Sequence, residues 1–245
     1  MSTRFQIEFF GATGTVTGSK YLLTIGSHRV LVDCGLFQGY KQLRLKNWAP
    51  PPFAPGSVDA VLLTHAHIDH SGYLPALVKN GFHRRVYCSR ATRELAEILL
   101  VDAAHLQEEE ASFANKNRFS RHQPALALFT TEDAHAAIRL LHGVNYNLAV
   151  KVASDVEAIW RPNGHMIGSA SVQVNAAGRS VVFSGDVGRP NDPLMRAPTP
   201  IEFADYLVLE STYGNRRHPI DGTLDALREV ITRTVSRGGS VLIPA

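Results

Sequence analysis

The sequence predicts a mixed α/β protein in which sheets are covered on the outside by helices. Its strand-like segments come in runs, and helical segments separate these runs, which is typical of that architecture. A second strand, not a helix, follows the first one, and this argues against a Rossmann-type opening. Gly11, Gly14 and Gly18 also miss the G-x-G-x-x-G spacing of dinucleotide-binding proteins.

The first half of the chain predicts several strands and one long helix. Strands are expected at residues 5–10, 20–25, 29–33 and 58–64, with a hairpin turn at 26–28. The last of these is a short apolar run bounded by polar residues, as in a buried strand. Residues 90–117 have helical spacing, with residues 108–110 on a solvated face. The apolar side of this helix is expected to consist of Leu95, Ile98, Leu99 and Leu106.

The second half predicts more strands and two further helices. Thr130 or Thr131 is expected to cap a helix that continues through Leu141, with Glu132 and Asp133 in its first turn. Strands are expected at residues 150–161, 171–176, 180–184 and 205–209. Residues 223–236 are expected to form a helix that glycines 238 and 239 close, and residues 241–243 to begin a buried strand.

Composition indicates a globular protein and permits an anionic partner without requiring one. Hydrophobic residues make up 44% of the chain, the formal net charge is +3 and the pI is about 9.0. Cys34 and Cys88 favour two reduced thiols over a disulfide framework. The N-terminus lacks the apolar core of a signal peptide, and no apolar run approaches the ~20 residues that span a bilayer. We therefore expect a cytoplasmic protein with no membrane association.

The strongest chemical signal is the segment T-H-A-H-I-D-H at residues 64–70, directly after the buried strand. Residues two apart in an extended chain point to the same side, so His65 and His67 can reach one metal ion. Asp69 and His70 follow as the chain turns into a helix, and they can face a second ion. Imidazole and carboxylate are suitable zinc ligands at about 2.0–2.2 Å. Packing four such groups together without a metal would be costly, so we expect a metal site here.

Two later residues are candidates for completing this site. His165 lies in a glycine-flanked turn, N-G-H-M-I-G-S, between two expected strands. Asp186 follows an apolar strand directly, in F-S-G-D-V-G. Each residue alone is more typical of an ordinary turn, but beside the histidine cluster each becomes a candidate ligand. The other histidines are expected to be ordinary surface or core residues.

These residues give the chain a resemblance to metallo-β-lactamase-fold hydrolases, specifically to the β-CASP branch of RNA-processing nucleases. Asp33 in L-V-D-C-G resembles the first motif of the superfamily, and residues 65–70 resemble its H-x-H-x-D-H second motif. His165 and Asp186 resemble the third and fourth motifs. The resemblance covers essentially the whole chain and implies an αββα sandwich, with two sheets between layers of helices.

Three further stretches narrow the resemblance. Residues 11–19 and the D-H-S-G-Y-L-P segment at 69–75 resemble bacterial and archaeal relatives of the mRNA 3′-end cleavage endonuclease. Residues 210–214, E-S-T-Y-G, resemble the acidic motif that opens the β-CASP insertion. The resemblance therefore predicts a metallo-β-lactamase domain at residues 1–209 and the first elements of a β-CASP domain at 210–245.

The resemblance also implies residue roles and a reaction. It assigns His65, His67 and His165 to a first metal ion, Asp69 and His70 to a second, and Asp186 to both. Asp33 would orient the histidine loop without binding metal, and Glu210 would hydrogen-bond a later histidine that protonates the leaving group. Asp69, Asp186 and Glu210 are thus the expected catalytic residues. Two Zn²⁺ ions, with Mn²⁺ or Fe²⁺ as alternatives, would activate a hydroxide that cleaves an RNA phosphodiester.

Two other functions remain open from the sequence. One is a thioester or small-phosphodiester hydrolase of the glyoxalase II type, against which residues 210–214 argue. The other is a non-catalytic RNA-binding paralogue, against which the intact ligand positions argue. RNA is the expected partner, and a homodimer is allowed.

The resemblance also implies residues that do not occur before Ala245. In the β-CASP nucleases the last metal-binding histidine and the leaving-group histidine lie beyond the insertion. We therefore expect the natural protein to continue for roughly 150–200 residues, about one more domain. We also expect the 245-residue form to hold its second metal ion more weakly and to have little nuclease activity.

Overall fold

The computed structural model describes residues 5–217 and 222–243. Contacts within the chain divide it into two units, Met1–Glu210 and Ser211–Ala245. The first unit contains all of the described strands and every described helix except α6 (Thr223–Ser236). The expected assignment of residues 1–209 to a metallo-β-lactamase domain and of 210–245 to a β-CASP domain stays a prediction.

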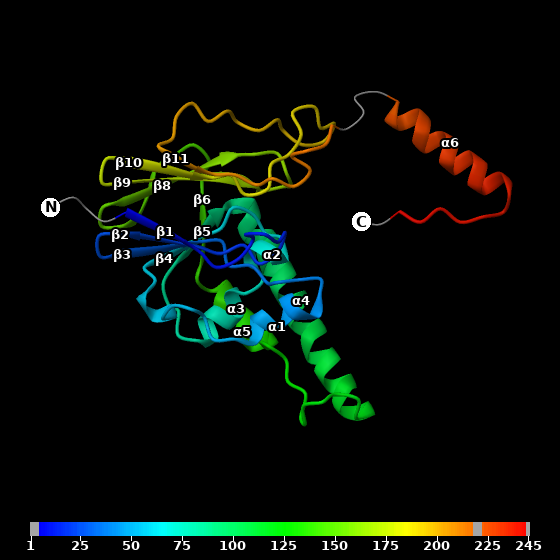
Figure 1. The fold of residues 1–245 in the computed structure, drawn as a ribbon, viewed down its shortest axis with the longest axis horizontal. Helices are drawn as coiled ribbons and strands as arrows, with labels where there is room; N and C mark the ends of the chain where they lie inside the picture. The colour runs from blue at the N-terminus through cyan, green and yellow to red at the C-terminus, as the bar shows by residue number, and fades with distance from the viewer. Residues whose placement is uncertain (1–4, 218–221, 244–245) are drawn as a thin grey trace. The chain divides into compact units, whose positions relative to one another are not determined.

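Two mixed sheets stack on each other in the first unit (Figure 1). The six-stranded sheet has the order β1 (Phe5–Phe9), β2 (Tyr21–Ile25), β3 (His28–Val32), β4 (Ala60–Leu62), β5 (Val86–Ser89) and β6 (Leu141–Val144). Its first three strands are antiparallel and β3 to β6 are parallel. The five-stranded sheet has the order β11 (Tyr206–Val208), β10 (Arg179–Phe183), β9 (Ala170–Ala176), β8 (Val156–Pro162) and β7 (Val150–Ala153). Only its β10–β11 pair is parallel.

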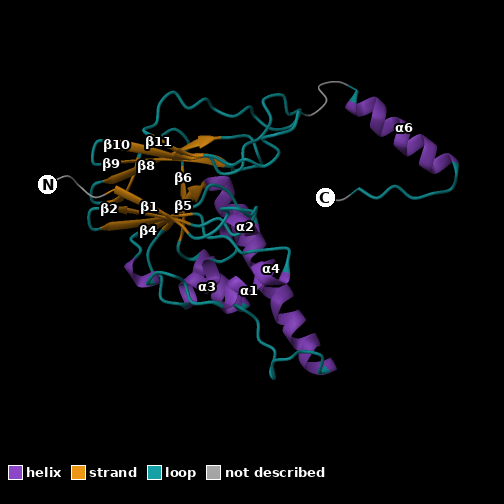
Figure 2. Cartoon of the chain, in the orientation of Figure 1, coloured by secondary structure: helices purple, strands orange, loops and turns teal. Residues whose placement is uncertain are grey.

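Helices cover the outer face of the six-stranded sheet (Figure 2). The main ones are α3 (Leu74–Lys79), α4 (Arg90–Asn117) and α5 (Thr131–Ile138), and the short ones are α1 (Lys41–Leu45) and α2 (Ile68–Ser71). The structure confirms two stacked sheets with helices outside them. Within the described part of the first unit, the helix layer lies on the six-stranded sheet only.

Apolar side chains from both sheets fill the space between them. Ala60 and Leu62 of β4 belong to this inter-sheet core, whereas Val61 faces the helices. This explains the continuous apolar run of the sequence, because a parallel strand is buried on both of its faces. Trp160 of β8 is fully buried in the same core, and its Nε1–H donates to the Leu63 carbonyl at 2.9 Å.

Trp160 offers a stability test of this core. We expect Trp160→Ala to lower the free energy of unfolding by about 3–5 kcal/mol, because it leaves a large cavity between the sheets. Trp48 is 54% exposed, and Trp48→Ala should cost about 0.5 kcal/mol or less. Urea unfolding monitored by circular dichroism measures both variants. Equal losses would contradict the assignment of Trp160 to the main core.

Several helix predictions are confirmed and others are wrong in detail. Helix α4 has the expected bounds, and Thr130 caps α5 through a reciprocal pair of hydrogen bonds with Asp133. However, Ile98 and Leu106 of α4 are exposed. The residues of α4 that are buried are Thr92, Ala96, Leu100, Ala104 and Ala114, whose mostly small side chains let the helix lie close to its neighbours.

Other differences arise from pairing between distant segments. Helix α5 ends at Ile138, because Leu141 pairs with Val86 and begins β6. Residues 150–161, expected as one strand, form two strands joined by a turn. Residues 108–110 are not all solvated, because Glu108 accepts a hydrogen bond from the backbone N–H of Thr131. The expected strand at 241–243 is absent from the described residues, and Leu242 is 91% exposed.

Two further expectations concern single side chains and membranes. Cys34 and Cys88 are both buried free thiols, as expected. Among the described residues, no helix combines the length and the apolar character needed to cross a bilayer.

Candidate metal centre

The candidate ligands come from loops at strand ends of both sheets. His65 and His67 follow β4, and α2 carries Asp69 and His70 as the chain turns into a helix. His165 lies in the loop between β8 and β9, and Asp186 follows β10. The Ala170 N–H donates to the Thr64 carbonyl at 2.9 Å and joins the two sets of loops. The fold therefore brings together residues that are about a hundred positions apart in the sequence.

Four of these side chains form one group. His65, His67, His165 and Asp186 each offer a ligand atom, and the four atoms lie within 4.8 Å of one another. His67 Nδ1 lies 3.0 Å from His65 Nε2 and 3.1 Å from His165 Nε2. His65 is fully buried, and the other three side chains are partly exposed. The group is thus open to solvent on one side.

Asp186 connects this group to the second pair of candidates. Its Oδ2 lies 3.5 Å from His165 Nε2 and 3.9 Å from His65 Nε2. Its Oδ1 lies 3.3 Å from His70 Nε2, which is itself 3.9 Å from Asp69 Oδ2. The two oxygens of one carboxylate therefore face two different sets of side chains.

Asp33 lies behind the cluster and is almost fully buried. Its Oδ1 accepts from the backbone N–H of Thr64 at 2.8 Å, and its Oδ2 accepts from His70 Nδ1 at 2.8 Å. The Thr64 hydroxyl lies 2.9 Å from the same Oδ2. Asp33 thus holds the start of the histidine segment and the ring of His70.

Burial and mutual repulsion favour the neutral form of His65 and His67. The pKa of His65 lies well below its usual range because the ring is buried and His70, His67 and His165 surround it. Burial and His165 also lower the pKa of His67. Burial disfavours protonation of His70 as well, but Asp33 and Asp186 outweigh it and raise its pKa to about 10. The space between His70 and the carboxylates therefore favours a positive charge.

The donor set fits a transition-metal ion. A neutral imidazole has one N–H, so three rings whose nitrogens converge on one point cannot all satisfy one another by hydrogen bonds. A cation at that point would accept a lone pair from each ring and from Asp186. Three imidazoles with one carboxylate are typical zinc ligands, and neutral rings are the form that binds metal.

A comparison with protein families agrees with this geometry. Residues 13–237 match the model of the Metallo-beta-lactamase superfamily, which is most of the chain. The chain belongs to this superfamily. The family match and the convergent group of His65, His67, His165 and Asp186, which could hold a metal ion, both indicate a divalent-metal site.

Curated members of the superfamily are similar to this chain over nearly its whole length. Ribonuclease TTHA0252 of Thermus thermophilus is 39% identical over 98% of the chain, which corresponds to 51% of that relative. Transcription termination factor FttA of Methanocaldococcus jannaschii is 27% identical, with 98% of the chain and 37% of the relative covered. Cleavage and polyadenylation specificity factor subunit 3-I of Arabidopsis thaliana is 30% identical, with 96% and 32% covered. The chain spans about half, or less, of the length of these metallo-β-lactamase relatives.

Glu210 does not belong to the convergent group, but it contacts the loop that carries Asp186. Its Oε1 accepts from the backbone N–H of Val187 at 2.6 Å, and its own N–H donates to the Ser184 hydroxyl at 3.0 Å. The carboxylate thus holds the loop that carries Asp186.

Sequence reasoning missed the residues that fix the His165 loop. Ser169 Oγ accepts from the backbone N–H groups of His165 and Met166, both at 3.1 Å. The buried hydroxyls of Ser89 and Thr92 donate to the Gly168 carbonyl at 2.6 and 2.8 Å. Ser169 could have been noticed as the polar end of the N-G-H-M-I-G-S turn. No local signal marks Ser89 or Thr92, which are separated from this loop by more than seventy residues.

Gly35 provides a test of how tightly the ligand loops pack in this metallo-β-lactamase fold. A Cβ at this position would lie 1.5 Å from the Asp69 carbonyl oxygen, so Gly35→Ala must displace α2. We expect a loss of about 1–3 kcal/mol in stability and weaker metal binding. Gly56→Ala is the matched control, because its Cβ would meet only the Gly81 oxygen at 3.5 Å. Unfolding and zinc titration that give identical results for the two variants would contradict this packing.

Proposed function

We propose that the protein is a metal-dependent ribonuclease that hydrolyses RNA phosphodiester bonds. One observation carries the proposal: a convergent His65, His67, His165 and Asp186 group lies in a chain that is 39% identical to a protein named as a ribonuclease. The relatives named as a transcription termination factor and as a cleavage and polyadenylation factor subunit also support an RNA substrate.

We further propose that the centre holds up to two Zn²⁺ ions, with Mn²⁺ or Fe²⁺ as alternatives. The first ion would be held by His65, His67, His165 and Asp186. The second ion would be held by Asp69, His70 and Asp186, so Asp186 is shared. Bound zinc supplies Lewis-acid polarisation of a phosphoryl oxygen and lowers the pKa of a coordinated water.

The chain's own groups then have orienting roles. Asp33 accepts the Nδ1–H of His70, so Nε2 is the atom that faces Asp69 and Asp186, and a bound ion would take the place of the Nε2 proton. Asp186 presents one oxygen to each set of ligands. Glu210 fixes the Val187 N–H next to Asp186, and its expected pairing with a later histidine stays a prediction.

A cleavage assay tests the proposal. Labelled RNA, DNA, a small phosphodiester and a thioester would be incubated with the 245-residue chain and with the complete product of its gene, with Zn²⁺ or Mn²⁺ added. We expect the complete product to cleave RNA, and we expect a chelator to abolish this cleavage. Hydrolysis of only the small substrates would favour the glyoxalase II-type alternative, and RNA binding without cleavage would favour a non-catalytic paralogue.

Two finer predictions accompany this proposal. Light scattering of the purified protein would test whether it forms a homodimer. Fractionation of the source cells would test the expected cytoplasmic location.

A further inference from the structure

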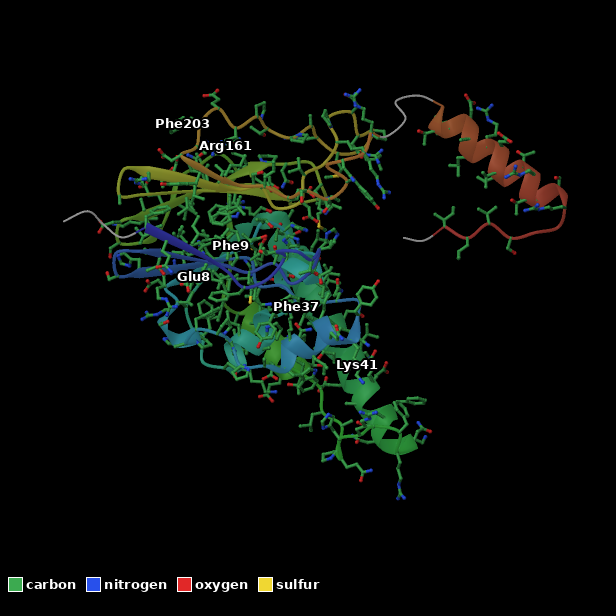
Figure 3. The ribbon with its side chains drawn as sticks, in the orientation of Figure 1. Glu8, Phe9, Phe37, Lys41, Arg161 and Phe203 are labelled. Carbon is green, nitrogen blue, oxygen red and sulfur yellow. The ribbon has the colours of Figure 1, made fainter. Side chains whose placement is uncertain are left out.

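A cavity of about 260 Å³ lies in the first unit, and none of the proposed metal ligands lines it. Its walls are mostly aromatic and apolar, with one buried lysine, and include Phe10, Lys20, Phe37, Phe53, Tyr73 and Leu77. Phe37, labelled in Figure 3, lies in the segment between β3 and α1. The proline-rich segment at residues 50–52 also lines the cavity.

Lys20 is an unusual wall residue, because only 7% of it is exposed. Its ammonium group donates to the Gly35 carbonyl and lies 4.9 Å from the centre of the Phe37 ring and 4.7 Å from that of Tyr73. No carboxylate in residues 5–217 or 222–243 forms an ion pair with it. A buried charge without a counter-ion is costly, and cation–π contacts offset only part of that cost.

The charge of Lys20 nevertheless persists at neutral pH. Burial lowers the pKa of its ammonium to about 8, and Cys34 acts weakly in the opposite direction. A pKa near 8 leaves the group mostly protonated at pH 7. Lys46 places a second ammonium 5.2 Å from the centre of the Phe37 ring. The cavity therefore combines apolar walls with two ammonium groups for which the described part of the chain supplies no ion pair.

We propose that this cavity binds a small organic carboxylate with an apolar or aromatic body, whose carboxylate pairs with Lys20. An ammonium group has three N–H donors, and the Gly35 carbonyl uses one of them. The aromatic and proline walls suit a flat apolar body. The volume lies below the roughly 300–1,000 Å³ of pockets for drug-sized ligands, so the ligand must be compact. A phosphate ester would bring additional polar oxygens and charge against the apolar walls, so we assign the site to a carboxylate.

A matched pair of ligands tests the proposal. Phenylacetate and phenylacetamide share one body and differ in charge, and calorimetric titration gives the dissociation constant of each. We expect phenylacetate to bind at least about tenfold more tightly, which corresponds to one charge-assisted hydrogen bond of about 1.4 kcal/mol or more. Lys20→Met should abolish this preference. Lys151→Met, the same change at an exposed lysine on β7, should preserve it.

A second variant protects the test against misfolding of Lys20→Met. Ala49 is an exposed residue at the cavity, so Ala49→Phe should fill part of the space without altering the charges. We expect it to weaken both ligands. Equal affinity for acid and amide, no binding of either, or tighter binding of phenyl phosphate would overturn the proposal. Phenylacetate binding that survives both Lys20→Met and Ala49→Phe would place the ligand outside this cavity and would also overturn the proposal.

Discussion

Asp186→Ala is expected to weaken the binding of both proposed metal ions. Its Oδ2 faces the three-histidine group and its Oδ1 faces His70, so the substitution removes a ligand from each set at once. Changes to residues that merely orient metal ligands cost 10–100-fold in affinity, and we expect more than about 100-fold for this shared ligand. Elemental analysis of the purified protein, followed by zinc titration at neutral pH, measures the effect. Cleavage of RNA by the complete gene product should be lost as well.

Two comparisons make this result specific to Asp186. Asp69→Ala should weaken mainly the second ion, because Asp69 lies near His70 and outside the three-histidine group. Asp155→Ala changes an exposed turn aspartate and should alter neither ion. Equal metal content in the Asp186, Asp69 and wild-type proteins would refute the shared-ligand assignment. A wild-type protein that neither contains metal nor takes it up would refute the whole centre.

Asp33→Asn is expected to weaken the binding of the proposed second ion while leaving the fold intact. The amide keeps one oxygen for the Thr64 N–H, but it then presents an NH₂ group to His70 Nδ1. Nδ1 must now accept, so the neutral ring carries its one proton on Nε2, the atom that faces Asp69 and Asp186. We expect the affinity for the second ion to fall by about 10–100-fold, as measured by competition with a chelator.

Asp59→Asn is a close control for this change. Asp59 also accepts from a backbone N–H, that of Arg29 at 2.9 Å, and also lies beside a histidine, His28. It precedes β4, whereas the metal ligands follow that strand. We expect Asp59→Asn to leave metal affinity unchanged. If both variants lose metal equally, or if Asp33→Asn retains full affinity, the orienting role of Asp33 is wrong.

Local patterns in the sequence were sufficient for the features that depend on neighbouring residues. The two-residue spacing of His65 and His67 and the change to a helix at Asp69 depend only on backbone periodicity, and the structure has both. Thr130 and the bounds of α4 were likewise readable, because capping and helical spacing act within a few residues. The choice of candidate ligands needed only their chemistry and their place after a strand.

Which atoms of distant side chains converge depends on the tertiary structure. It selected Nδ1 of His67 but Nε2 of His65 and His165, and it turned the two oxygens of Asp186 toward different partners. These choices depend on ring orientations that loops from both sheets impose together. The early end of α5 at Ile138 has a similar cause, since Leu141 pairs with Val86 of β5 and so belongs to the sheet. Residue types and their local spacing thus predict which side chains could serve a metal ion. Packing between distant segments sets which of their atoms converge, because hydrogen bonds and contacts across the fold outweigh local preferences.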